Sequence, residues 1–435
     1  MIPTGGRDSA GRRNPAVGRS GGRRAIIGIL VAVAVMLGVE GLARLLTGPP
    51  EIPVVVRMPD GSEGLFEEQE GRLHPRLPEH AAWWPRGPKQ AGHPRIVLLG
   101  GSSLAGPPSD RRLAAWRLAE RFDAEVVDLA VGGMDTAHLV ATLPGALSLD
   151  PDLVLIYSGH NDLGNAVFSR RFADPGAVAV ARARQVLGHS RVFSLLEALW
   201  RGREERHIVV QWDQRDMALT EAEKALVLAE YERRMSRIVH QVREAGVPVV
   251  LSTVVSNAFF PSVHWQCPER LEALGVTPSR TAILPLDGVD PDAVEAARAA
   301  APCRDLDQVA ARLMWDRDRA AAVDLLERLR DGDPKPLRAP RAVNDAIRRI
   351  AVQQGAVLAD TAREWKRRGG GVEPPLWFRD PVHMSAVGHE ALAAAWVPAV
   401  AEALGLAAPD PGWPDPLPRA ATSCLSPRCP RGRRR

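Results

Sequence analysis

Short, continuously apolar runs alternate with amphipathic stretches through most of this chain. A continuous apolar run is typical of a strand that is buried on both faces of a sheet. Five such runs predict strands, at residues 95–101, 124–133, 151–162, 247–257 and 356–360. Stretches with helical spacing lie between and after them, at 111–122, 136–147, 219–246, 341–355 and 385–405. Strands that alternate with helices, without hairpin signals, predict a central parallel sheet covered by helices on both faces.

Two long insertions interrupt this alternation, at residues 164–219 and 258–338. Each follows a predicted strand, so each leaves from the carboxyl end of the sheet, where loops usually carry binding residues. Residues 47–92 are rich in proline and charge, and we expect a linker that packs partly on the body. Residues 93–408 are predicted to form one domain, and residues 409–435 a disordered basic tail.

The N-terminal pattern is that of a membrane anchor. A basic lead of residues 1–24, predicted to be disordered, precedes the stretch Ala25 to Leu46, whose 22 residues match the ~20 needed to span a bilayer. Glu40 and Arg44 are spaced to pair on one helix face. Arginines before the stretch and an acidic body after it predict a single-pass inner-membrane protein with a periplasmic body. A cleaved signal peptide is the alternative, but no small-residue cleavage site follows the apolar run.

The basic charge of the chain is concentrated at its two ends. The net charge is +4, yet six arginines lie in residues 1–24 and six more in 419–435. The body between them is acidic, and it lacks the mixture of aromatic and basic residues that binds nucleic acid. We therefore expect no nucleic-acid partner, and no feature of the sequence points to an obligate protein partner.

Four cysteines are few for a chain of 435 residues. In an extracytoplasmic body, Cys267 could pair with Cys303, and Cys424 with Cys429. No group of cysteines and histidines has the spacing of zinc ligands, so we expect no metal.

Small polar motifs mark the ends of the predicted strands. They are "GGSS" (100–103), "VGGMD" (131–135) and "GHND" (159–162), and a fourth motif, "DPVH" (380–383), precedes the last helix. Because the carboxyl ends of parallel strands meet at one edge of a sheet, we expect these motifs to lie together. Acyl transfer needs a nucleophile, a base, an orienting acid and hydrogen-bond donors for the oxyanion.

Each of these roles has a candidate in the four motifs. Ser102 is the expected nucleophile, on a glycine turn that leads into a helix. His383 is the expected base, and Asp380 is expected to orient its imidazole from the same loop. The backbone N–H groups of Ser102 and Gly133 and the side-chain amide of Asn161 are the expected oxyanion donors.

The motifs in this order resemble the SGNH, or GDSL-type, hydrolase superfamily. Its four marker residues correspond to Ser102, Gly133, Asn161 and His383, and the resemblance covers residues 93–405 apart from the insertions. It implies a flavodoxin-like three-layer α/β/α fold and ester hydrolysis without a cofactor.

One position departs from the family pattern. The aspartate that usually precedes the nucleophile is Gly101 here, a variant that also occurs in the family. Ser102 and Ser103 are therefore adjacent, and the motif register favours Ser102. "VLSTVVSNAFFP" and "DPKPLRAPRAVNDAIRRIA" resemble a membrane-anchored subgroup, which implies that Asn257 and Arg338 line the substrate pocket.

Each motif also has a simpler interpretation when it is taken alone. The two glycines before Ser102 resemble a phosphate-binding turn, but no Walker lysine follows and the spacing is not that of a dinucleotide site. Gly133 is otherwise a turn glycine, Asn161 a helix cap and His383 a surface residue. Four such coincidences in the family's order are less probable than one site.

The sequence therefore predicts a membrane-anchored serine esterase. Its expected substrate is an O-acylated envelope glycan or a short lipid ester, neutral rather than anionic because the body is acidic. Transfer of an acyl group to an envelope sugar uses the same triad and is the first alternative. A catalytically inactive glycan-binding module is the second, and the intact set of Ser102, Asp380 and His383 argues against it.

Overall fold

The chain divides into two units. In the computed structural model the described residues are 20–47, 54–58, 61–69, 72–77, 80, 84–85, 89–106, 113–169, 171–172, 174, 176–207, 218–262, 265–278 and 284–414. Unit 1 comprises Met1–Ile52 and Val186–Gly202, and unit 2 comprises Pro53–Gln185 and Arg203–Arg435.

A five-stranded parallel sheet forms the centre of unit 2. Its strands, in spatial order, are β5 (Glu125–Asp128), β4 (Arg95–Gly100), β6 (Leu153–Tyr157), β8 (Val249–Ser252) and β9 (Val357–Ala359). All four neighbouring pairs are parallel. Every residue of β4 and β6 is buried, as their continuous apolar sequences require. The five strands predicted from the sequence are thus confirmed.

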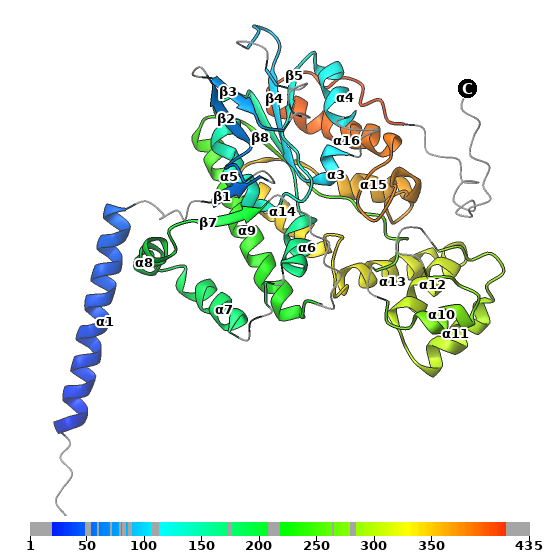
Figure 1. Cartoon of the computed structure of the whole chain (residues 1–435), viewed down its shortest axis with the longest axis horizontal. Helices are drawn as coiled ribbons and strands as arrows, with labels where there is room; N and C mark the ends of the chain where they lie inside the picture. Colours follow the sequence, from blue (N-terminus) through cyan, green and yellow to red (C-terminus); the bar gives the residue numbers. More distant parts are fainter. Residues whose placement is uncertain are drawn as a thin grey trace, which may run out of the picture. The chain divides into compact units, whose positions relative to one another are not determined.

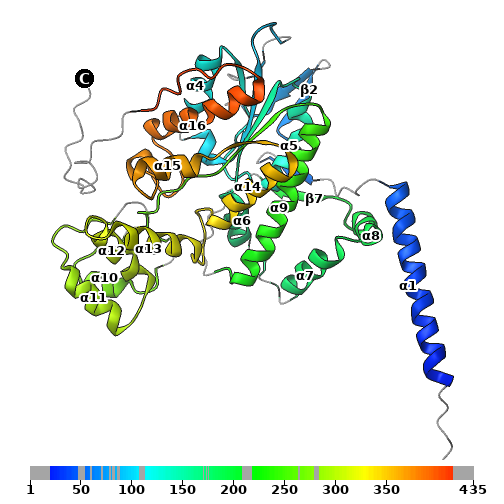
Figure 2. The ribbon, with the colours of Figure 1, turned by 180° about the vertical axis from the view of Figure 1, so that it is seen from behind.

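Helices cover both faces of this sheet (Figures 1 and 2). One face carries α4 (Leu113–Phe122), α15 (Thr361–Gly369) and α16 (Ala386–Leu404). The other carries α5 (Thr136–Leu147), α9 (Glu221–Glu244) and α14 (Arg341–Gln354). The expected flavodoxin-like three-layer α/β/α sandwich is therefore confirmed.

Four short strands outside the central sheet are a finding that the hydrophobic pattern did not predict. β1 (Val54–Arg57) pairs in parallel with β7 (Glu204–His207), and β2 (Phe66–Gln69) forms an antiparallel hairpin with β3 (Arg72–Pro75). Val56, Met58 and Leu65 of this region are buried in the main core. The segment expected as a linker therefore supplies β1, β2 and β3. These strands were missed because each has only four residues, too few for a clear hydrophobic pattern.

The two insertions are mainly helical. The first carries α6 (Asn161–Phe168), α7 (Ala177–Leu187) and α8 (Arg191–Arg201). The second carries α10 (Pro268–Ala273), α11 (Pro291–Ala300), α12 (Arg304–Met314) and α13 (Arg319–Asp331). A disulfide joins Cys267 to Cys303 at the starts of α10 and α12. The expected pairing of Cys424 with Cys429 lies outside the described residues.

Unit 1 is built around one long apolar helix, α1 (Ser20–Leu46). Residues Ile26–Leu46 form a span of 21 residues with a mean hydropathy of 2.5, none of it buried within the protein. The helix is long and apolar enough to cross a membrane. An N-terminal signal sequence has the same length and composition.

We predict that Leu98→Ala in β4 destabilises the protein by about 2–5 kcal/mol, because it opens a cavity in a closely packed core. Leu98 is completely buried in the middle of the sheet. The measurement is thermal unfolding of the detergent-solubilised chain. Val352→Ala, at a side chain that is 82% exposed, is the matched control and should change stability by less than about 0.5 kcal/mol. Equal melting temperatures for the two variants would contradict the described core.

Candidate active site

The first strand of the sheet ends on two glycines because other atoms come too close for a side chain. A Cβ atom at Gly100 would lie 2.6 Å from the carbonyl oxygen of Tyr157, and one at Gly101 would lie 2.5 Å from Nδ2 of Asn161. Directly after this tip, Ser102 begins the short helix α3 (Ser102–Ala105). The close approach therefore places Ser102 at the carboxyl end of β4, beside the end of β6.

A chain of hydrogen bonds joins Ser102 to a loop 281 residues later in the sequence. Nε2 of His383 lies 2.9 Å from Oγ of Ser102. Nδ1 of His383 lies 2.6 Å from Oδ2 of Asp380. The other carboxylate oxygen, Oδ1, accepts from the backbone N–H groups of Val382, at 2.9 Å, and of His383, at 2.8 Å. The structure therefore brings together the three residues expected as nucleophile, base and orienting acid.

The Asp380 carboxylate is held in its ionised form. Burial by itself would raise its pKa, but hydrogen bonds from His383 and from the two backbone N–H groups outweigh this, so the pKa of Asp380 lies below its ordinary value. An ionised Asp380 accepts a hydrogen bond from Nδ1–H of His383. Nε2 is then left as the acceptor that faces the hydroxyl of Ser102.

The expected oxyanion donors lie at the ends of the neighbouring strands. Asn161 begins α6, and its Nδ2 donates to the carbonyl of Met134 at 2.7 Å. Gly133 has a φ of +80°, a conformation that favours glycine, and its carbonyl accepts from Nδ2 of Asn165 at 2.9 Å. An amide nitrogen carries two hydrogens, so Asn161 keeps one for a further acceptor.

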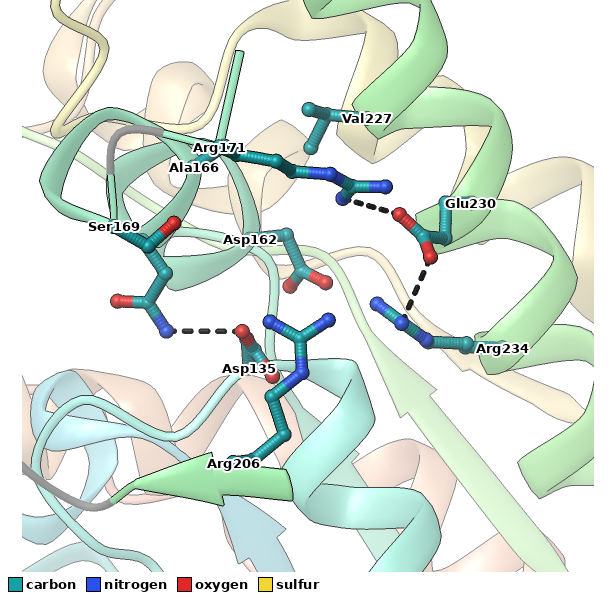
Figure 3. A pocket seen from close by; sticks show the side chains of 10 residues that line it. Asp135, Asp162, Ala166, Ser169, Arg171, Arg206, Val227, Glu230 and Arg234 are labelled. Carbon is teal, nitrogen blue, oxygen red and sulfur yellow. Dashed lines mark hydrogen bonds and ion pairs between the residues drawn. The ribbon is translucent and has the colours of Figure 1, made fainter. Parts of the chain in front are cut away.

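A buried cluster of charged residues lies behind these donors, and sequence reasoning missed it. Figure 3 shows the guanidinium groups of the cluster lying among its carboxylates. Its members come from α5, α6, α9 and β7 and their flanking residues: Asp135, Asp162, Arg171, Arg206, Glu230 and Arg234. The two aspartates are part of the "VGGMD" and "GHND" motifs. The arginines come from the first insertion and the helix after it, where no motif marks them.

Asp135 connects this cluster to the glycine turn. It caps α5, accepting from the backbone N–H of Ala137 at 3.0 Å and lying 2.8 Å from Nδ1 of His138. Its other oxygen accepts from Nδ2 of Asn165 at 2.9 Å. Burial would raise the pKa of Asp135, but the charge and hydrogen bond of His138 and the nearby Arg206 lower it overall. Asn165 thus ties the carbonyl of Gly133 to an ionised group.

Asp162 is the carboxyl with the raised pKa in this buried pair. Burial and the negative charge of Asp135 raise the pKa of Asp162 to about 7, against hydrogen bonds from the side chain and the backbone N–H of Thr136. Two carboxylates in one buried site cannot both ionise without a large cost. A protonated Asp162 avoids that cost and still accepts from Thr136.

Asn257 and Arg338 contact the backbone of the loops around the site. Both side chains are buried. The guanidinium of Arg338 donates to the carbonyls of Asn257, at 3.1 Å, and Phe260, at 2.7 Å. Asn257 donates through Nδ2 to the carbonyl of Pro375 and through its backbone N–H to the carbonyl of Pro381, within the triad loop. These polar groups are thus bonded to backbone carbonyls, and their place in the substrate pocket stays a prediction.

His160 is a neutral neighbour of the triad. Its burial, together with the charge of His383, lowers the pKa of His160 to about 3. Its Nδ1 accepts from the backbone N–H of Ala339 at 3.1 Å. The ring therefore fixes the start of α14 without adding charge beside Ser102.

One group in the described part of the chain combines metal-ligating residue types: Cys267, Cys303 and Asp305. The two cysteines are joined in the disulfide, so they supply no thiolate. The carboxylate of Asp305 accepts from the backbone N–H groups of Gln266 and Cys267, each at 2.8 Å. These contacts stabilise the start of α10.

Comparison with known proteins assigns most of the chain to a described family. The model of the GDSL-like lipase/acylhydrolase family matches residues 98–391, a range that contains Ser102, Asp380 and His383. No match was found among the curated proteins.

Among solved structures, the chain is similar to an acetylxylan esterase from Geobacillus stearothermophilus, with 15% identity over 71% of this chain and 94% of that chain and a TM-score of 0.34. It is also similar to a GDSL-like lipase from Bacteroides thetaiotaomicron, with 11% identity over 75% of this chain and 94% of that chain and a TM-score of 0.36.

We predict that Asp162→Asn changes how stability depends on pH. Because the folded pKa of Asp162 is raised, the native state keeps a proton that the unfolded chain releases above about pH 4. Its stabilising contribution is present below that pH and is lost as the pH rises through the folded pKa. The asparagine variant lacks this loss, so its melting temperature should rise relative to the wild type between about pH 4 and 8.

The control is Asp292→Asn, at an exposed residue of α11. Its melting temperature should follow that of the wild type across the range. A difference between Asp162→Asn and the wild type that stays constant with pH would show that Asp162 is ionised in the folded protein.

Proposed function

Because the chain belongs to the GDSL-like lipase/acylhydrolase family, hydrolases of ester bonds, we propose that it is a serine esterase that acts through Ser102, His383 and Asp380. The observation that carries this proposal is a pair of hydrogen bonds, in which Nδ1–H of His383 donates to Asp380 and the hydroxyl of Ser102 donates to Nε2 of His383. This arrangement activates a hydroxyl that is otherwise a weak nucleophile at neutral pH.

The reaction proceeds through an acyl-enzyme. His383 takes the proton of Ser102 as Oγ attacks the carbonyl carbon of the ester, and Asp380 stabilises the imidazolium that forms. His383 then gives this proton to the departing alcohol, which leaves the acyl group on Ser102. A water molecule, deprotonated by His383, attacks the acyl carbon, and the carboxylic acid leaves as Ser102 regains its proton.

The negative oxygen of each tetrahedral intermediate is stabilised by fixed donors. In our proposal these are the backbone N–H groups of Ser102 and Gly133 and the second amide hydrogen of Asn161. Asn161 is held by its bond to the carbonyl of Met134, and the carbonyl of Gly133 is held by its bond from Asn165. Donors that are already oriented need no reorganisation during the reaction, which is where most of their benefit arises.

The exposure of the triad favours hydrolysis over acyl transfer. The side chain of His383 is 28% exposed and that of Asp380 is 37% exposed. Water therefore reaches the base that must activate it in the second step. An acyltransferase has to keep water away from the same acyl-enzyme.

The proposed substrate is a neutral ester of the cell envelope, either an O-acylated glycan or a short lipid ester. The support is the acidic body, which repels anionic substrates, and α1, which we propose as an inner-membrane anchor with the catalytic domain in the periplasm. Transfer of the acyl group to an envelope sugar remains the alternative outcome.

The triad predicts three losses of activity. Ser102→Ala and His383→Ala should each lower kcat for 4-nitrophenyl acetate by at least about 10⁴-fold, and Asp380→Asn by about 10⁴-fold. Labelling of the purified chain with a fluorophosphonate should also disappear in Ser102→Ala. The matched control is Ser103→Ala, which removes the adjacent, buried hydroxyl and should keep both activity and labelling. If Ser103→Ala abolished labelling and Ser102→Ala did not, the assignment of the nucleophile would be wrong.

Gly101 provides a separate test of the oxyanion site. The new Cβ atom of Gly101→Ala would displace the Asn161 amide, so kcat should fall by about 10²-fold or more, as for the loss of one oxyanion donor. The control is Gly164→Ala in α6, where the new Cβ would meet its nearest neighbour at 3.6 Å, an ordinary contact. Full activity of Gly101→Ala would exclude Asn161 as an oxyanion donor.

A further inference from the structure

The helix α8 (Arg191–Arg201) exposes a strongly apolar face. The apolar residues Val192, Leu195, Leu196, Leu199 and Trp200 recur at helical spacing. The side of this face that unit 1 leaves uncovered is formed by Leu196, 61% exposed, Leu199, 81% exposed, and Trp200, 84% exposed. Three large apolar side chains in one and a half turns are unusual on a surface that contacts only water.

A partly buried carboxylate joins this helix to α1. Glu40 of α1 accepts hydrogen bonds from the backbone N–H of Arg191 at 2.7 Å, from that of Val192 at 3.2 Å and from the hydroxyl of Ser190 at 2.8 Å. These groups are the N-terminus of α8, where a negative charge is favourable. Arg44 of α1 adds two hydrogen bonds, donating to Glu40 at 2.7 Å and to the carbonyl of His189 at 2.8 Å.

These contacts of Glu40 explain why an acidic residue is tolerated in an apolar helix. The side chain of Glu40 is only 18% exposed, and its oxygens have partners from α8 and Arg44. A carboxylate without partners would be costly at this point of a membrane-spanning helix. Glu40 thus holds the N-terminus of α8 beside its own position in α1.

The position of Glu40 along α1 agrees with the boundary region of a membrane. The apolar span ends at Leu46, six residues after Glu40, which is about 9 Å along a helix. Amphipathic helices that lie in the membrane interface bury their apolar face about 5–10 Å into the lipid. If Ile26–Leu46 spans the bilayer, α8 starts at the depth at which such helices lie.

We propose that α8 is an interfacial helix whose apolar face, formed by Leu196, Leu199 and Trp200, inserts into the lipid surface beside α1. The bound partner is the bilayer itself. Leucine supplies buried apolar area, tryptophan favours the headgroup region, and Arg191 at the start of the helix can reach the lipid headgroups. The proposal rests on α1 as a membrane anchor and is independent of the catalytic chemistry.

The test uses the full chain in phosphatidylcholine vesicles whose acyl chains carry bromine, a short-range quencher of tryptophan fluorescence. No tryptophan lies in α1, so lipid-accessible fluorescence comes from elsewhere in the chain. We expect Trp200→Phe to lower the quenched fluorescence by roughly half or more, because an inserted side chain contacts the lipid directly. Trp116→Phe, which removes a 44% exposed tryptophan of α4, is the matched control and should leave the quenching unchanged.

Three results would overturn the proposal. One is equal quenching in Trp200→Phe and the wild type while both float with the vesicles. Another is failure of the wild type to float, which would remove the anchor on which α8 depends. The last is a cross-linked dimer in vesicles that Leu196→Ser with Leu199→Ser dissociates, because α8 would then bind a second copy. Hydrolysis of a soluble ester should be the same in Trp200→Phe and the wild type, so failure of the catalytic proposal is observed separately.

Discussion

The close approach between the tip of β4 and the residues at the end of β6 is the constraint on which the rest of the site depends. Without side chains at Gly100 and Gly101, the tip lies against the carbonyl of Tyr157 and the amide of Asn161. This contact brings the ends of β4 and β6 together, and with them Ser102 and Asn161. The absence of side chains at Gly100 and Gly101 therefore permits this close packing.

Around this contact, the structure positions each reacting group through groups that do not react. Asp380 is oriented by backbone N–H groups of its own loop. That loop is tied to Asn257, which Arg338 holds in turn. On the other side, Asn165 connects the Gly133 carbonyl to Asp135. The buried charges thus stabilise the geometry of the site. The raised pKa of Asp162 limits their cost, because a proton on one of the two aspartates removes the repulsion between them.

The sequence predicted the central sheet and the candidate triad because both depend on local patterns. Buried parallel strands are continuously apolar, and strand ends carry short motifs that topology must bring to one edge. The pairing of β1 with β7 was not predictable, because it joins two short segments about 150 residues apart and β7 is largely charged. Arg206 and Arg234 were missed because an exposed arginine and an arginine in an ion pair look alike in sequence. The roles of Asn257 and Arg338 depend on which carbonyls they reach, which only coordinates show.

The disulfide of the second insertion bears on how the protein has to be produced. Cys267 and Cys303 are 36 residues apart, and the link between them restricts the unfolded chain of a helical segment with only a small core of its own. Such a link forms and persists in oxidising compartments and is rare where glutathione keeps thiols reduced. Material made in a reducing cytosol would therefore carry this insertion without its covalent link. Export during expression, or oxidative refolding, is the route to a uniform sample.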